Sequence, residues 1–363
     1  MLKSQIPTYS QQRKDDHVEQ ALTQQQQHTQ SQFESIRFVH HSFAPLAIED
    51  ISISTEWANH QHTLPFYING MTGGSEKTKH YNQQLAQLAH HTGLAMASGS
   101  VSGALSDSSV ADSFTIIRKE NPNGFVMANL GAHHSVENAK RAVDLLQANA
   151  LQIHLNVPQE IVMPEGDRNF KSWLPNIEAI VKSLDVPIIV KEVGFGMSQE
   201  TIQQLINVGV TTIDVSGRGG TNFIAIENHR RDHLDFQSLI NWGQTTPEAL
   251  LEASPYMDKA TILASGGIND FADIIKALAL GAQAVGLSGR FLHMVHTNGV
   301  EKSIIQVNEW TEAIQQMMLL LGARTIKDLH QTDLVLSPEL AHWAQARGVA
   351  WQQFAVRSRK KLL

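Results

Sequence analysis

Residues 261–290 read TILASGGINDFADIIKALALGAQAVGLSGR. The apolar run Thr261–Ser265 ends at two glycines, and the stretch Asp270–Leu280 has the apolar spacing of a helix. A second apolar run, Ala284–Ser288, again ends beside a glycine. The order of strand, helix and strand predicts two parallel strands that are joined by a crossover helix.

The same unit recurs along the chain before this stretch. Six earlier apolar runs read as strands: Leu64–Asn69, Leu94–Ser98, Phe125–Asn129, Leu151–Leu155, Pro187–Val193 and Thr212–Ser216. The other predicted helices are Glu76–His91, Val110–Lys119, Ser135–Ala148, Lys171–Leu184, Ser198–Val208, Pro247–Ala253 and Gln306–Leu321. An open doubly wound sheet would also fit such an alternation. The count of eight strands, with small polar residues at their carboxyl ends, favours an α/β fold of the TIM (β/α)8 barrel type.

The length of 363 residues exceeds the roughly 250 that a (β/α)8 barrel needs. We therefore expect an N-terminal extension over residues 1–60, a barrel over 61–330 and a C-terminal extension over 331–363 that packs on the barrel. Two long gaps, Asn156–Asn169 and Gly217–Gln244, follow the fourth and sixth strands. Both lie on the expected active-site side, where long loops supply lids or binding groups.

Composition excludes several classes of protein. The net charge of −7 argues against a nucleic-acid-binding or polybasic membrane surface. The absence of cysteine excludes disulfides, thiolate metal sites and a cysteine nucleophile. No secretory leader and no apolar run of membrane-spanning length is visible, so we expect a cytoplasmic protein without a membrane partner.

Glycines at the ends of the last two predicted strands indicate a phosphate site. Gly266 and Gly267 follow the seventh strand, and Ser288 and Gly289 follow the eighth. Glycine lets backbone N–H groups approach a phosphate closely, and barrels often bind phosphate at this position. The same glycines could instead serve only as tight turns.

Other strand ends carry polar groups that suit the edge of a flavin ring, which favours FMN as the phosphate ligand. They include Asn69-Gly70-Met71-Thr72, Ser98-Gly99-Ser100 and Asn129. Lys191, near the end of the fifth strand, could stabilise an anionic reduced flavin. The alternative for Lys191 is a salt bridge inside the barrel with Glu192 or Asp214.

Several motifs together resemble the type 2 isopentenyl-diphosphate isomerases. The most specific are the segment from His154 through Gln159-Glu160 to Pro164-Glu165-Gly166-Asp167-Arg168, and the motif Lys191-Glu192-Val193-Gly194-Phe195-Gly196. The others are Arg13-Lys14-Asp15-Asp16-His17, Met71-Thr72-Gly73-Gly74, Gly219-Gly220-Thr221-Asn222-Phe223 and Ser265-Gly266-Gly267. The resemblance runs from about residue 10 to the Ala355-Val356-Arg357 tail.

The resemblance implies an FMN barrel that interconverts isopentenyl and dimethylallyl diphosphate, with Mg²⁺ and with NADPH as the usual source of reduced flavin. The implied substrate-binding residues are Arg13, Lys14, His17, Ser100, His154 and Gln159. Gln159, His154 and Asn156 would be catalytic, and Glu160 would bind the metal. The implied FMN contacts are Gly70, Met71, Thr72, Ser100, Asn129, Lys191, Ser216, Thr221, Gly266, Gly267, Ser288 and Gly289. A homo-oligomer, tetrameric or octameric, is also implied.

The chemistry of these residues agrees with that implication. Arg and Lys donate to a diphosphate, and a Glu oxygen suits Mg²⁺. Because the motifs contain few acid–base side chains, we hypothesise that reduced FMN exchanges the proton, with Gln159 assisting. The runner-up function is FMN-dependent oxidation of 2-hydroxy acids, although no histidine adjoins the glycines after strand six.

Two segments depart from this pattern or have no function within it. Val101 replaces a polar residue that is common in the family, so a substrate contact from positions 101–102 is in doubt. The polar first 35 residues, read without the resemblance, indicate a solvated helix or a frayed tail. The glutamine-rich Gln24–Gln27 receives no functional interpretation.

Overall fold

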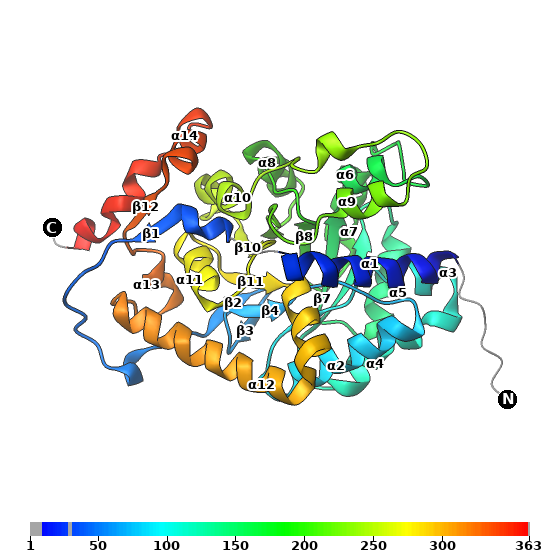
Figure 1. Cartoon of the computed structure of the whole chain (residues 1–363), viewed down its shortest axis with the longest axis horizontal. Helices are drawn as coiled ribbons and strands as arrows, with labels where there is room; N and C mark the ends of the chain where they lie inside the picture. Colours follow the sequence, from blue (N-terminus) through cyan, green and yellow to red (C-terminus); the bar gives the residue numbers. More distant parts are fainter. Residues whose placement is uncertain (1–8, 28–30, 362–363) are drawn as a thin grey trace.

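A computed structural model describes residues 9–27 and 31–361. Eight parallel strands close into a barrel in the order β10-β11-β4-β5-β6-β7-β8-β9, which confirms the predicted fold (Figure 1). The barrel strands are β4 (Phe66–Ile68), β5 (Met96–Ala97), β6 (Val126–Gly131), β7 (Ala150–Leu155), β8 (Ile188–Glu192), β9 (Thr212–Asp214), β10 (Thr261–Ser265) and β11 (Ala284–Leu287). Each lies within, or within two residues of, a predicted run.

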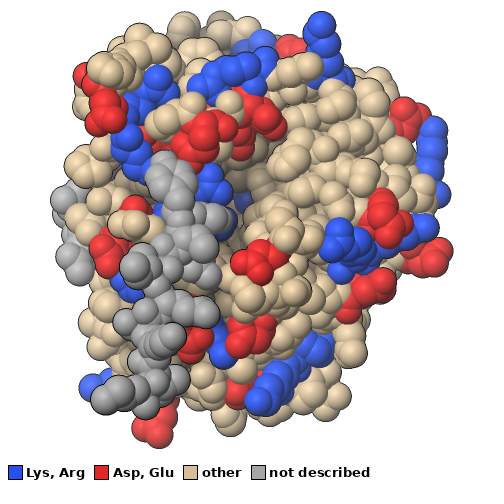
Figure 2. Space-filling model, turned by 90° about the vertical axis from the view of Figure 1, so that its right-hand side faces the viewer, with Lys and Arg blue, Asp and Glu red and all other residues tan. Residues whose placement is uncertain are grey.

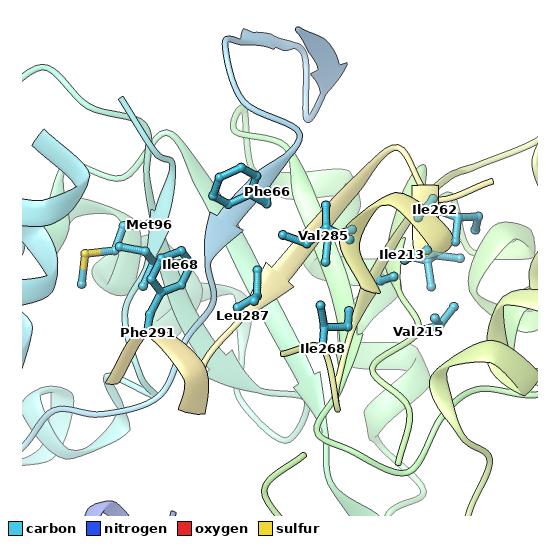
Figure 3. Packing of buried hydrophobic residues seen from close by; sticks show 14 of the residues in the cluster. Phe66, Ile68, Met96, Ile213, Val215, Ile262, Ile268, Val285, Leu287 and Phe291 are labelled. Carbon is cyan, nitrogen blue, oxygen red and sulfur yellow. The ribbon is translucent and has the colours of Figure 1, made fainter. Parts of the chain in front are cut away.

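Successive side chains of a barrel strand lie in two environments, the layer outside the barrel and the barrel interior. Phe66 and Ile68 of β4 point outward and pack with Phe291 in the layer between barrel and helices (Figure 3). Tyr67, between them, points inward and is fully buried. Because neighbouring side chains of a strand point to opposite faces, one apolar run supplies both the outer layer and the barrel interior.

Helices surround the barrel and follow the predicted order. They are α2 (Glu76–Thr92), α4 (Asp112–Glu120), α5 (Val136–Leu146), α7 (Trp173–Ser183), α8 (Gln199–Asn207), α10 (Thr246–Ala253), α11 (Phe271–Ala279) and α12 (Gly289–Leu320). The prediction for the last helix was wrong at its start. α12 begins at Gly289 and bends at Gly299, whose φ of 72° breaks the helical backbone. Polar residues such as Asn298 hid its first part from a search for apolar periodicity.

A small hairpin closes the amino-terminal end of the barrel. Its strands are β2 (Thr55–Trp57) and β3 (His60–His62), which pair antiparallel. The ring of Trp57 stacks on His62 with centroids 4.0 Å apart and packs edge-on against Phe125. The inward-facing residues above it, such as Tyr67 and Met127, continue this apolar plug.

The opposite end of the barrel is covered by α1 (Tyr9–Gln27), with α3 (Ser102–Ser106), α6 (Val157–Val162) and α9 (Phe223–His229) beside it (Figure 1). α6 and α9 lie in the two long gaps. The interpretation of the N-terminal segment as a solvated or frayed tail was wrong for α1, because Val18, Ala21 and Leu22 are buried. Gln24 also exchanges two hydrogen bonds with the backbone of Asn222.

A strand that precedes the barrel pairs with a strand that follows it, outside the barrel. β1 (Ile36–Phe38) pairs antiparallel with β12 (Leu334–Leu336). The remaining elements are α13 (Ile326–Leu329), α14 (Pro338–Ala346) and the 3₁₀ helices η1 (Gln32–Ser35), η2 (Ile48–Asp50), η3 (Ser108–Val110), η4 (Gln237–Leu239), η5 (Ser254–Tyr256) and η6 (Trp351–Lys361). Arg347 bonds the buried Glu252 of α10, which ties the C-terminal region to the barrel. Within the described residues, no helix has the length and apolarity to span a bilayer.

Candidate active site

A cavity of about 400 Å³ opens at the carboxyl ends of the barrel strands. Strand ends, residues of α6 and α9, and one face of α1 form its wall. Figure 2 looks onto this end of the molecule and shows a hollow with Lys and Arg side chains beside it. The cavity therefore lies at the end where (β/α)8 barrels carry their active sites.

The structure brings nearly all of the predicted site residues together around this one cavity. Those with predicted substrate, catalytic or metal roles are Arg13, Lys14, His17, Ser100, His154, Asn156, Gln159 and Glu160. Those with predicted FMN contacts are Gly70, Met71, Ser100, Asn129, Lys191, Ser216, Thr221, Gly266, Gly267, Ser288 and Gly289. Their roles remain predictions, whereas their common location is observed.

Thr72 is the one predicted site residue that does not line the cavity. Its side chain is buried, and its hydroxyl has no hydrogen-bond partner among the described residues. Its carbonyl oxygen accepts hydrogen bonds from Gly99 N at 3.0 Å and from Asn82 Nδ2 at 3.3 Å. The Thr72 backbone thus holds the end of the second barrel strand in place.

The glycines after β10 and β11 form a cradle. Gly266 has a φ of 93°, and a Cβ on it would lie 1.9 Å from the Gly217 carbonyl oxygen, so only glycine fits there. A Cβ on Gly289 would instead meet side chains of the cavity wall, with Gln25 Oε1 at 3.2 Å and Thr221 Oγ1 at 3.4 Å. α12 begins at Gly289 without a side-chain cap, so its first N–H groups can bind an anion.

A chain of amides crosses the barrel below the cavity. Asp214 on β9 is fully buried and accepts a hydrogen bond from Asn69 Nδ2 at 2.9 Å. Gln152 Nε2 donates to Asn69 Oδ1 at 3.0 Å, and Asn129 Nδ2 donates to Gln152 Oε1 at 3.1 Å. His154 Nδ1 lies 2.8 Å from Asn129 Oδ1. Period-two alternation turns Gln152 and His154 inward from the same strand, β7, and the other members come from other strands or strand ends of the barrel.

Lys191 is buried, and no side-chain ion pair of it is found in the part of the chain that the structure describes. Its Nζ donates to the Glu192 carbonyl oxygen at 2.5 Å. The Glu192 carboxylate turns away and accepts from the backbone N–H groups of Val193, Gly194 and Phe195. Burial lowers the pKa of Lys191, and the nearby Asp214 and Glu192 oppose that shift. The salt-bridge alternative for Lys191 is thus not observed.

α1 brings cationic groups to the cavity rim. Arg13 Nη1 bonds Glu165 Oε1 at 3.2 Å, and His17 Nε2 lies 3.0 Å from Glu227 Oε1. Desolvation and the neighbouring Arg13 lower the pKa of Lys14 to about 8. An arriving anion would favour the charged form of Lys14 and relieve this repulsion.

Glu227 on α9 accepts hydrogen bonds from several residues of this rim. The sequence analysis did not identify it as a site residue. It is fully buried, and its oxygens accept hydrogen bonds from His17, from Gln159 Nε2 at 3.0 Å and from Arg230. Burial acts to raise its pKa, but these hydrogen bonds and charges hold it at about 2. Glu227 is therefore ionised at neutral pH and fixes the Gln159 amide toward itself.

Glu160 presents one carboxylate near the rim. Its Oε1 accepts from Asn156 Nδ2 at 2.9 Å, and its Oε2 accepts from Asp167 N at 2.8 Å. No cluster of three or more potential metal ligands occurs among the described residues. A single carboxylate still suits Mg²⁺, which commonly uses one or two carboxylates together with substrate phosphates and water.

The structure after β5 shows which of positions 101 and 102 reaches the cavity. Its side chain is fully buried in the core and cannot contact a ligand. Ser102, by contrast, lines the cavity and lies 2.9 Å from Ser100 and 2.6 Å from His134 Nε2. Burial and the neighbouring His133 lower the pKa of His134 to about 4.

The cavity suits FMN on three observations of this structure. The glycine cradle lines the cavity, and a Cβ at Gly289 would meet side chains of the cavity wall. Lys191 provides a buried amino group without an ionic partner among the described residues. Thr72 has a buried hydroxyl without a hydrogen-bond partner within those residues. Each is a feature that a bound phosphate or polar flavin edge would explain.

Comparisons with known proteins agree with this geometry. The FMN-dependent dehydrogenase family matches residues 118–336. The isopentenyl-diphosphate delta-isomerase of Latilactobacillus sakei subsp. sakei (strain 23K) is 52% identical over 335 residues, covering 92% of this chain and 96% of that protein. This chain belongs to the type 2, FMN-dependent isopentenyl-diphosphate delta-isomerase family. The predicted family is thereby confirmed.

Further members of the family are similarly close. The isopentenyl-diphosphate delta-isomerase of Staphylococcus haemolyticus (strain JCSC1435) is 49% identical, covering 93% of this chain and 97% of that protein. Among solved structures, a mandelate oxidase mutant with a monooxide FMN adduct has a TM-score of 0.60 at 18% identity, covering 88% of this chain and 92% of that one. A mutant flavocytochrome b2 with pyruvate bound has a TM-score of 0.62 at 20% identity, covering 95% of this chain and 82% of that one. These two structures share the fold.

Proposed function

We propose that this protein interconverts isopentenyl diphosphate and dimethylallyl diphosphate. The observation that carries the proposal is that one cavity joins a glycine cradle to the cationic face of α1. A flavin phosphate and a substrate diphosphate each require such groups, so the cavity can hold both anions. Relatives that are 49–52% identical and are named isopentenyl-diphosphate delta-isomerase support the same reaction.

The diphosphate would bind at the rim below α1. Arg13 and Lys14 would donate to its oxygens, with His17 and His154 on either side, and Glu160 would bind Mg²⁺ on the same group. Charge-assisted hydrogen bonds of this kind are about twice as strong as neutral ones. This arrangement would leave the hydrocarbon part of the substrate near Gln159.

The flavin would lie across the barrel mouth. Gly266, Gly267, Ser288 and Gly289 would hold its phosphate, and Lys191 would face the polar edge of its ring. The remaining predicted contacts would come from Gly70, Met71, Thr72, Ser100, Asn129, Ser216 and Thr221. When bound and reduced, for which NADPH is the proposed donor, FMN supplies an electron-rich ring and an N5 that can exchange a proton.

Double-bond transposition adds a proton to one carbon and removes one from another. A catalytic acid needs a pKa near the working pH. Glu227 does not meet this requirement, because its pKa is about 2. Glu165 does not meet it either. Burial acts to raise the pKa of Glu165, but the hydrogen bond from Arg230 and other contacts lower it overall. The role of Gln159, with its amide held by Glu227 and Asn156, is to orient the substrate carbons.

The test is to add isopentenyl diphosphate to the protein with reduced FMN and Mg²⁺ and to follow the dimethyl product by NMR. We expect conversion to an equilibrium mixture while the flavin stays reduced. Reconstitution with 5-deazaFMN, which has carbon in place of N5, should abolish turnover without preventing binding. A protein that binds FMN but forms no product under these conditions contradicts the proposal.

The match to the FMN-dependent dehydrogenase family keeps oxidation of 2-hydroxy acids as the second candidate. Such a reaction needs an arginine to hold the substrate carboxylate. Arg13 and Arg230 instead pair with Glu165, which disfavours this function. Anaerobic addition of mandelate should leave the oxidised flavin absorbance unchanged, whereas bleaching would support the second candidate.

A further inference from the structure

The amide chain across the barrel has a fixed direction. The backbone N–H of Gly70 donates to Asn69 at 2.9 Å, so that atom of Asn69 is the carbonyl oxygen Oδ1. The other atom, Nδ2, then faces Asp214, which also accepts from Ser265 Oγ and from Ser216 N. A buried carboxylate at one end and a backbone donor at the other leave Asn69 a single orientation.

The orientation of Asn69 determines every later member of the chain. Since Asn69 Oδ1 accepts, the Gln152 atom that faces it is the donor Nε2. Gln152 Oε1 then accepts from Asn129 Nδ2, which leaves Asn129 Oδ1 as an acceptor toward His154. His154 Nδ1 must therefore carry a hydrogen in order to donate across 2.8 Å.

The other ring nitrogen of His154, Nε2, lies on the cavity side. A Cβ on Gly131 would lie 3.3 Å from His154 Nε2 and 2.7 Å from His133 Nδ1, so Nε2 points to the side where His133 lines the wall. A neutral imidazole with its hydrogen on Nδ1 has only a lone pair on Nε2. Such a nitrogen cannot donate to a phosphate oxygen.

We propose that Asp214, through Asn69, Gln152 and Asn129, fixes His154 as the Nδ1–H tautomer, so that binding of a diphosphate is coupled to uptake of one proton at His154 Nε2. This inference rests on the proposed function, because it takes the diphosphate as the anion that His154 meets. Asn69, Gln152 and Asn129 are then positioning residues that act through His154.

The groups around His154 explain why the proton must arrive with the anion. They are Lys191 on β8, Lys14 on α1, and His133 and His134 after β6. Burial first, and then these groups, lower the pKa of His154 well below 6.5. A diphosphate would offset the positive charges and accept the new hydrogen bond, which raises the pKa of His154. Affinity should therefore fall up to tenfold between pH 7 and 8 because of His154, and the neutralisation of Lys14, with a pKa of about 8, adds to the fall at higher pH.

Isothermal titration calorimetry measures that proton directly. Isopentenyl diphosphate is titrated into the protein with oxidised FMN and Mg²⁺ at pH 7, where Lys14, with a pKa of about 8, is already mostly charged, in two buffers of different ionisation enthalpy. We expect uptake of about one proton, since a histidine gains one site on binding. His154→Gln should bind more weakly and take up none. His330→Gln, which removes a half-buried histidine that does not line the cavity, should keep the uptake.

NMR of ¹⁵N-labelled histidine tests the tautomer without any substrate. In the FMN-loaded protein, His154 should show a protonated Nδ1 and an unprotonated Nε2, and Gln152→Met should give a mixture of both tautomers. A hydrogen on Nε2 in the wild type, or an unchanged proton count in His154→Gln, overturns the inference. If the Nδ1–H tautomer is present but no diphosphate binds, the proposed function has failed. If diphosphate binds but the tautomer or the proton uptake is absent, the inference about His154 has failed.

Discussion

The two ends of the barrel are built from the same strands but have opposite chemistry. At the amino-terminal end, Trp57 and His62 stack under a plug of apolar residues that leads up to Tyr67. At the carboxyl end, inward-facing positions carry groups such as Asn129 and Lys191, and α1 adds polar residues such as Arg13 to the same cavity. The difference places stability at one end of the barrel and ligand chemistry at the other.

The two ends also differ in whether their buried groups already have interaction partners when no ligand is bound. The plug buries complete aromatic surfaces, and the energy of such packing is realised without any ligand. The mouth contains a buried lysine without an ionic partner among the described residues and a glycine cradle that lines an open cavity. The mouth therefore reaches its lowest energy only when anions are bound. Each of the following experiments tests one end of the barrel while the other serves as reference.

The largest effect is expected at the closed end. Trp57→Ala removes a buried ring from the plug and should lower the free energy of unfolding by about 3–5 kcal/mol. Chemical denaturation measures this loss. The kcat of the folded fraction should stay unchanged, and a large fall in kcat would show that the two ends are not independent.

A smaller effect is expected from the cations of α1. Arg13→Ala combined with Lys14→Ala removes charge-assisted contacts worth roughly 2–3 kcal/mol in total, so KM for the diphosphate should rise about 30- to 150-fold. Steady-state kinetics measures this rise. The control is Lys77→Ala, which removes a cation that pairs with Glu19 outside the cavity. An unchanged KM in the double variant would show that α1 covers the cavity without binding the substrate.

Glu160 should have a weaker, metal-specific effect. Glu160→Gln keeps the shape of the side chain but removes its charge, so about tenfold more Mg²⁺ should be needed for half-maximal activity. FMN should remain bound, because the glycine cradle and Lys191 are unaltered. Flavin absorbance after gel filtration checks this point, and loss of flavin from the variant would refute the assignment of Glu160 to the metal.

The smallest effect is a pH dependence at the closed end. Burial, and then the neighbouring His60, lower the pKa of His62 to about 4. The folded protein therefore holds His62 neutral, whereas the unfolded chain gains a proton below pH 6.5, and stability falls as the pH falls. We expect a loss of about 1 kcal/mol between pH 6.5 and 5.5 from His62. His62→Phe should reduce that slope, whereas the exposed His91→Gln should leave it intact.

The sequence predicts the regular part of this molecule well. Because side chains alternate along a strand, polar residues at the carboxyl ends of apolar runs, such as Asn129, His154 and Lys191, had to point into the barrel mouth. Their proximity followed from the barrel alone. The family motifs added Arg13 and Gln159, for which periodicity offers no signal.

The remaining features depend on contacts between distant segments. Glu227 lies on a short helix in a long loop, and its partner His17 is 210 positions away in sequence. No local pattern marks such a pair. Gln25 is similar: it lines the cavity and donates to Asn269, although it stands in a glutamine-rich stretch that composition assigns to solvent.

The central claim, that FMN occupies the cradle at the open end, is tested most directly by the dissociation constant of FMN in Gly289→Ala. The added Cβ would meet the side chains of Gln25 and Thr221 and fill the proposed phosphate position, whereas Gly103→Ala adds a Cβ with no atom within 4 Å. We predict that flavin fluorescence quenching shows at least tenfold weaker binding for Gly289→Ala, and wild-type binding for Gly103→Ala, with both apoproteins equally stable. Wild-type affinity in Gly289→Ala would contradict the account.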